Sequence, residues 1–186
     1  PPPLRWSAAS DVYKRQEFEV YPYRDSLPFI EQYDLDHNWK IKHFVRGTLR
    51  LKGWADAWSE IFNEIETLSG EAGEKRLIEM SEQFWQDNAY GENEPDRVIL
   101  CVDLKAEQDN HVIWHKTYKM DAWGDERGTA MARLVSHPVS FAVKAIIDNQ
   151  IEYGVSAAAS KSSLVDKWLN DIANLAQEFN IIDHTK

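Results

Sequence analysis

Two strand-like runs joined by a tight turn constrain the fold of this chain more than any other feature. Residues 98–104 and 112–120 are rich in β-branched and aromatic side chains, and the tripeptide Gln108-Asp109-Asn110 lies between them. This pattern is typical of an antiparallel hairpin, because Asp and Asn tolerate the backbone conformations that a tight turn requires. The sequence therefore predicts a hairpin, and with it a sheet, in the second half of the chain.

Helical periodicity lies on both sides of the predicted hairpin. Apolar residues recur every three or four positions at 54–68 and 74–90, where the second stripe includes Leu77. Residues 129–149 are apolar with few charges, which predicts a helix covered by other elements and kinked or interrupted at Pro138.

A last helix is predicted from the capping pattern at Ser163 to Phe179, with Trp168 on its buried stripe. A short aromatic strand at 18–21 comes first in the chain. The order of these elements predicts an α+β fold with a mixed β-sheet and flanking helices.

The segment 41–52 carries the clearest chemical signal. Its residues alternate between an apolar and a cationic face, which predicts a strand on which Arg46, Thr48 and Arg50 point the same way. A guanidinium fork and a hydroxyl can together bind a carboxylate. Arg24, in the turn after the first strand, is expected to approach the same place. The alternative is an edge strand whose cations give solubility and pair with the acidic helix at 56–66, and the residues alone leave both readings open.

Composition disfavours several classes of partner. The 21 Lys and Arg against 31 Asp and Glu give a net charge of -10, which disfavours nucleic-acid binding. We expect no apolar run to approach the roughly 18 to 20 residues that span a bilayer. The single cysteine, Cys101, has alternating apolar neighbours and predicts a buried strand thiol in a reducing compartment. We therefore expect a cytoplasmic protein with neither a nucleic-acid nor a membrane partner.

Motifs for cofactors and metals are missing from the sequence. None of the 8 glycines forms a dinucleotide fingerprint or a phosphate loop. His111 and His115 have the spacing of metal ligands on a helix, but on a strand they lie about 13 Å apart, so we expect no metal site from that pair. The run from Asp34 to Asn38 lacks the glycine and glutamate of a calcium loop.

Residues 1–16 differ in composition from the rest of the chain and show no sustained period. They resemble a translated sequencing-adapter scar ending in Ser-Asp-Val-Tyr-Lys-Arg-Gln, and a disordered proline-containing arm is the alternative. We expect that the native protein continues upstream and that native sequence begins near Glu17.

Two motifs in order resemble a known family. Tyr21-Pro-Tyr-Arg24-Asp25-Ser26, followed after about twenty residues by Arg46-Gly47-Thr48-Leu49-Arg50, is similar to paired segments of saccharopine dehydrogenase, the NADP-dependent, glutamate-forming enzyme. Gly128-Thr129-Ala130-Met131-Ala132 at the start of an apolar helix, and Gly154-Val155, resemble the same family. The resemblance runs from about Glu17 to the C-terminus.

The resemblance implies a division of labour in the parent protein. An N-terminal Rossmann domain, missing here, binds NADP(H); residues 17–150 form a substrate and dimerisation domain, and 151–186 a helical segment that packs on the Rossmann domain. The family's substrate-binding residues fall on Arg24, Thr48, Leu49 and Arg50. The lysine and aspartate proposed for proton transfer lie upstream, so no catalytic, cofactor-binding or metal-binding residue is assigned in this chain.

The implied function is hydride transfer at a secondary amine or imine of an amino-acid conjugate such as saccharopine, in lysine metabolism, by a cytoplasmic homodimer. The chain alone is expected to be inactive. Tyr23 replaces the family's usual asparagine, and the helical region 56–90 is long and acidic, so the exact substrate stays open. The alternatives are a carboxynorspermidine dehydrogenase-like enzyme of polyamine synthesis and a non-catalytic binding or interaction domain.

Overall fold

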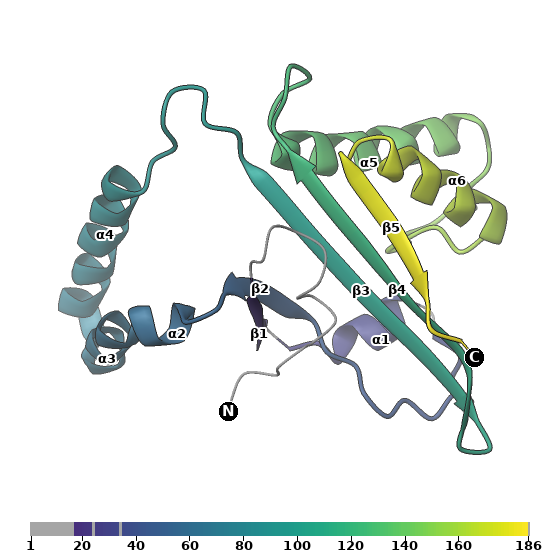
Figure 1. The fold of residues 1–186 in the computed structure, drawn as a ribbon, viewed down its shortest axis with the longest axis horizontal. Helices are drawn as coiled ribbons and strands as arrows, with labels where there is room; N and C mark the ends of the chain where they lie inside the picture. The colour runs from purple at the N-terminus through teal and green to yellow at the C-terminus, as the bar shows by residue number, and fades with distance from the viewer. Residues whose placement is uncertain (1–16, 24, 34, 186) are drawn as a thin grey trace. The chain divides into compact units, whose positions relative to one another are not determined.

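The computed structural model describes residues 17–23, 25–33 and 35–185, and it confirms the α+β class (Figure 1). Helices and antiparallel sheets are distributed over two compact units. Within the described residues, the first unit comprises the parts up to Leu27 and from Ile41 to Glu92, and the second comprises Pro28–Lys40 and the chain from Asn93 onward.

The first unit contains a two-stranded antiparallel sheet. Strand β1 (Phe18–Pro22) pairs with β2 (Gly47–Leu51), with Val20 opposite Leu49. The strand predicted at 18–21 is confirmed, whereas the prediction of a strand over the whole of 41–52 is wrong in its first half. Because β1 ends at a proline, which cannot extend a hydrogen-bonded ladder, the residues before position 46 have no β1 residue to pair with.

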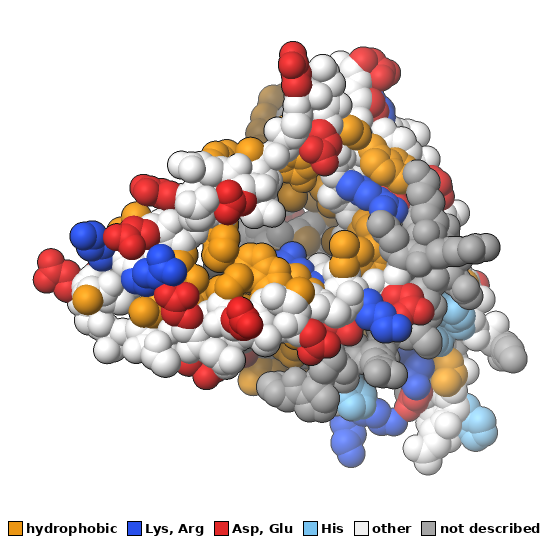
Figure 2. All heavy atoms as spheres, turned by 60° about the vertical axis from the view of Figure 1, so that its left-hand side comes forward, with side chains coloured by type: hydrophobic (Ala, Val, Ile, Leu, Met, Phe, Trp, Pro, Cys, Tyr) orange, Lys and Arg blue, Asp and Glu red, His pale blue; other side chains and the backbone are white. Residues whose placement is uncertain are grey.

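Three helices complete this unit: α2 (Trp54–Ala57), α3 (Ser59–Thr67) and α4 (Gly70–Asp87). They confirm the two predicted helical regions, with a break at Trp58 and an earlier start for α4. Trp58 lies 5.9 Å from Trp54 and 5.3 Å from Phe84 between ring centroids, so aromatic contacts join these helices. Leu77 was expected to be buried but is 43% exposed. Hydrophobic side chains also reach the surface among charged ones on the face drawn in Figure 2.

The second unit is built on a three-stranded antiparallel sheet in the order β3-β4-β5, which follows a short helix, α1 (Pro28–Gln32). Strands β3 (Arg97–Gln108) and β4 (His111–Trp123) form the predicted hairpin, extended at both ends. Its turn residues have positive φ, 49° at Asp109 and 61° at Asn110, as a two-residue type I′ turn requires.

The end of the chain differs from the prediction. Helix α6 (Ser162–Ala173) stops early, and Phe179 lies in a third strand, β5 (Glu178–Asp183), opposite Met120 of β4. Helical spacing continues as far as Phe179, but the β-branched pair Ile181 and Ile182 favours a strand once the edge of β4 is available. Pairing with a distant strand therefore overrides the local periodicity.

Helix α5 (Ala130–Ile147) was predicted correctly in position, and the Thr129 hydroxyl caps it by accepting from the backbone N–H of Ala132 at 3.1 Å. It is not covered as expected, because Val139 is 61% exposed and Ile147 72%. By length and composition alone α5 is also apolar enough to cross a bilayer, which corrects the expectation that no segment qualifies. Core helices of soluble proteins meet the same criterion.

Candidate functional site

The predicted anion-binding residues of β2 occupy two faces of the small sheet. Thr48 and Arg50 lie opposite Tyr21 and Glu19 of β1, and alternation places these four side chains on one face. The Leu49 side chain points to the other face, opposite Val20. Arg24 lies outside the described residues, so its predicted approach to Arg50 stays a prediction.

Arg50 is held by an aromatic ring. Its guanidinium carbon lies 5.3 Å from the centroid of the Trp54 ring, within the range of a cation–π contact. Trp54 in turn meets Tyr21 edge-on at 5.2 Å. Among the described residues no carboxylate lies within ion-pair distance of Arg50. The N–H donors of its fork therefore remain available to a ligand.

The acidic residue opposite Arg50 in the sheet register already has a hydrogen-bond partner. Glu19 faces Arg50 in the register, but its carboxylate accepts a hydrogen bond from the Tyr21 hydroxyl at 2.7 Å. That bond to the Glu19 carboxylate is the main reason why the pKa of Tyr21 is raised. The Lys52 ammonium pairs with Glu17, which directly precedes β1, rather than with the acidic helix at 56–66. The alternative reading of the cationic face thus finds no support at these two positions.

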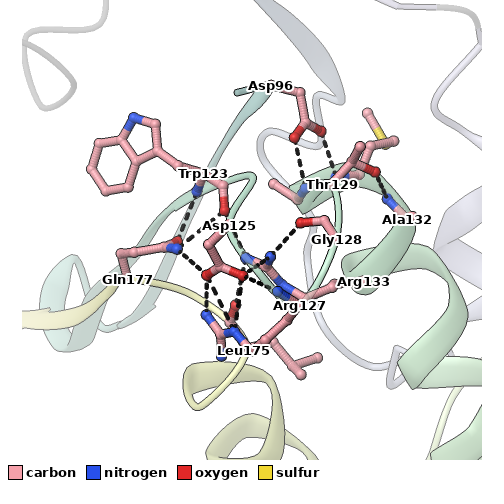
Figure 3. Close-up of polar contacts among 12 residues, drawn as sticks. Asp96, Trp123, Asp125, Arg127, Gly128, Thr129, Ala132, Arg133, Leu175 and Gln177 are labelled. Carbon is pink, nitrogen blue, oxygen red and sulfur yellow. Dashed lines mark hydrogen bonds and ion pairs between the residues drawn. The ribbon is translucent and has the colours of Figure 1, made fainter. Parts of the chain in front are cut away.

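A second polar cluster surrounds the start of α5, where the Gly128-Thr129 motif lies (Figure 3). The two oxygens of the Asp96 carboxylate accept from the backbone N–H groups of Ala130 at 2.7 Å and Met131 at 2.8 Å. A helix N-terminus of this kind can bind phosphate, but here a carboxylate of the chain itself takes that place. The described residues of this motif therefore do not fit a dinucleotide, and its role is structural.

Arg133 is the buried centre of this cluster, with only 3% of its side chain exposed. It donates at 2.7 Å to each of three acceptors, the Asp125 carboxylate and the carbonyls of Gly128 and Trp123. A longer contact of 3.4 Å reaches the Leu175 carbonyl. Arg133 thereby joins the end of β4, the turn before α5 and the segment after α6.

The Asp125 carboxylate accepts from several donors at once. Hydrogen bonds from Arg127 chiefly, with the charge of Arg133 adding to them, lower the pKa of Asp125 from 3.8 to about 2. Gln177 also donates to this carboxylate at 2.8 Å. A carboxylate saturated with donors of its own chain has no free lone pair for a substrate, so this cluster stabilises the fold.

One face of the three-stranded sheet is polar, and the sequence analysis did not predict this face. Asp121 is fully buried and accepts two hydrogen bonds from Arg97, at 2.9 and 2.5 Å, while Thr117 is also fully buried. The signal was present in the alternation of β4, whose odd positions are His111, Ile113, His115, Thr117, Lys119, Asp121 and Trp123. Cys101 is half-buried on this face, and burial raises the pKa of its thiol.

Comparison with known families agrees with this arrangement of strands and helices. The family model of the saccharopine dehydrogenase C-terminal domain matches residues 3–174. A comparison with curated proteins found no match. The match covers β1, β2, the start of α5 and Gly154-Val155, where the motifs of the sequence resemblance lie, and it also covers the hairpin.

Proposed function

Since the chain belongs to the saccharopine dehydrogenase C-terminal domain family, we propose that it is the substrate-binding part of an NADP(H)-dependent oxidoreductase. Membership implies an oxidoreductase parent, and the family generally uses nicotinamide cofactors. Hydride transfer is the chemistry of the cofactor, whereas the protein supplies positioning and electrostatics. In this proposal NADP(H) is held by residues outside this chain, and Arg50 with Thr48 binds a carboxylate of the substrate.

The proposal rests on the contacts that the Arg50 guanidinium makes within the chain. Its guanidinium contacts the Trp54 ring, and no described acidic side chain neutralises it. A guanidinium stacked on a ring keeps its edge free for the parallel hydrogen bonds that a carboxylate accepts. Thr48 lies two residues along the same face of β2, so its hydroxyl supplies a further donor.

The substrate class follows from this chemistry together with the family. We propose a saccharopine-like amino-acid conjugate, in which glutamate and lysine share a secondary amine and three carboxylates are present. The reaction interconverts that amine and an imine. Leu49, whose side chain lies on the other face, holds β2 against Val20 of β1 rather than contacting the ligand with its side chain.

Substitution of Arg50 tests the proposal in the enzyme encoded by the complete gene. Arg50→Ala should lower kcat/KM for saccharopine by about 10- to 150-fold, because a hydrogen bond to a charged group contributes about 1.5–3 kcal/mol. Arg50→Lys should recover part of the loss, since one ammonium replaces the fork. Arg76→Ala is the matched control: Arg76 pairs with Glu64 at 2.6 Å in the same unit and should leave kcat/KM unchanged. Unchanged KM and kcat in Arg50→Ala would remove the assignment.

The proposal also includes a cytoplasmic homodimer and an inactive isolated chain. Both are inferred from the family rather than from contacts within the chain. Light scattering on the complete enzyme measures its mass, and a monomer would contradict the first part. NADPH oxidation by the 186-residue chain alone would contradict the second.

A further inference from the structure

Three strands of the second unit bring two histidines and a carboxylate together. Asp103 comes from β3 and His115 from β4, while His184 follows directly after β5, near the C-terminus in Figure 1. The potential ligand atoms of these residues all lie within 4.8 Å of one another. We propose that Asp103, His115 and His184 form a binding site for a divalent transition-metal ion of the Zn²⁺ type.

The geometry of the side chains supports a metal site. The His115 Nε2 atom lies 3.1 and 3.2 Å from the two Asp103 oxygens, and the two imidazole rings lie with centroids 4.6 Å apart at an interplanar angle of 36°. Zn²⁺ bonds of about 2.0–2.2 Å place tetrahedral ligand atoms about 3.4 Å from each other. Closing the group around an ion therefore requires only small side-chain rotations.

A buried hydroxyl forms hydrogen bonds with two of the three ligand side chains. Thr117, which is fully buried, donates to Asp103 at 2.6 Å, and its oxygen lies 2.9 Å from the His184 Nε2 atom. The one hydroxyl thus contacts both the Asp103 carboxylate and the His184 ring, and it orients the two side chains together. Such outer-shell hydrogen bonds orient metal ligands and fix their tautomers.

The backbone fixes the same residues in register. The His184 N–H donates to the His115 carbonyl at 2.9 Å, and the His115 N–H donates to the Thr185 hydroxyl at 2.9 Å. These backbone hydrogen bonds therefore fix His115 and His184 side by side, so His184 does not lie on a free terminus. The side chains of Asp103 and His115 are 24% and 26% exposed, and His184 is exposed, which gives an ion access from solvent.

The ligand set selects the class of ion. Two imidazoles and one carboxylate suit Zn²⁺ and its first-row neighbours, whereas Mg²⁺ and Ca²⁺ prefer sites built from oxygen alone. Three protein ligands leave a fourth position for water. The ammonium of Lys105, on the same face as His115, pairs with Glu107 at 2.6 Å, which reduces its repulsion of a cation.

Calorimetric titration of the untagged 186-residue chain with Zn²⁺ tests the site. The wild type should bind one Zn²⁺ per chain, and Thr117→Val should weaken binding by about 10- to 100-fold through loss of the orienting hydroxyl. His184→Ala and Asp103→Asn should weaken it at least as much. His111→Ala, on the same hairpin but outside the group, is the matched control and should bind as the wild type does.

Two results would overturn the site: no saturable Zn²⁺ binding by the wild type, or equal affinity in His184→Ala and His111→Ala. Folding is checked by the thermal midpoint in the presence of a chelator, and His184→Ala should match the wild type there because its side chain is exposed. Asp103→Asn provides a second variant that keeps the shape of the side chain. With Co²⁺ as the probe, the visible bands of a four-coordinate ion should appear in the wild type and be lost in both variants.

Discussion

Replacement of Arg133 by methionine should destabilise the second unit severely. Methionine retains apolar bulk but removes the charged donor that lies 2.7 Å from the carbonyls of Trp123 and Gly128. Each carbonyl keeps only a neutral donor at 3.1 Å, the Gln177 amide and the Asp125 backbone N–H respectively. A hydrogen bond to a charged group contributes about 1.5–3 kcal/mol, so the loss of the two costs about 3–6 kcal/mol. Domains of this size have only about 5–15 kcal/mol of stability, so this is a large share.

Urea unfolding and hydrogen exchange together measure this loss. With an m value of about 2 kcal/mol/M, the midpoint of the second unit should fall by about 1.5–3 M. Because the chain has two units, exchange of peptides covering β4 and α5 is needed to assign the loss to the second one. Arg127→Met is the control and should have a smaller effect, since the Arg127 side chain is 44% exposed. A midpoint and a β4 exchange pattern equal to those of the wild type would refute the role of Arg133.

Three further predictions concern carboxylates of the second unit. Asp96→Ala should cost about 1–2 kcal/mol of unfolding free energy, measured by thermal denaturation, because it removes the carboxylate that accepts from the first two backbone N–H groups of α5. Asp121→Asn should cost about 3–5 kcal/mol, since it leaves Arg97 without its buried partner; a loss below that of Asp96→Ala would argue against the pair. The pKa of Asp125 is lowered to about 2, so its contribution is present above about pH 4 and is lost as the pH falls toward 2. Asp125→Asn should therefore show a shallower fall of Tm over that interval than the wild type does.

Local chemistry explains what could be predicted from the sequence. The β3-β4 hairpin was found because its turn is specified by Asp109 and Asn110 themselves, which take up positive φ. The start of α5 was found because Thr129 both precedes the apolar run and caps it. Thr48 and Arg50 were correctly placed on one face of a strand, since alternation depends only on neighbouring residues.

Non-local pairing explains what could not be predicted. β5 was read as the end of a helix because its partner, β4, is more than fifty residues away in the chain. The Arg97–Asp121 pair depends on hairpin register, which periodicity alone does not give. For the same reason His115 was compared with His111, its neighbour in sequence, rather than with His184, which only the third strand brings close.

A crystal structure of the complete enzyme with saccharopine would decide whether Arg50 and Thr48 bind a carboxylate of the substrate. In that structure a substrate carboxylate should accept two hydrogen bonds from the Arg50 guanidinium, at about 2.7–2.9 Å, and one from the Thr48 hydroxyl, while Trp54 stays in contact with the guanidinium. Saccharopine bound with all three carboxylates away from Arg50 would contradict this prediction.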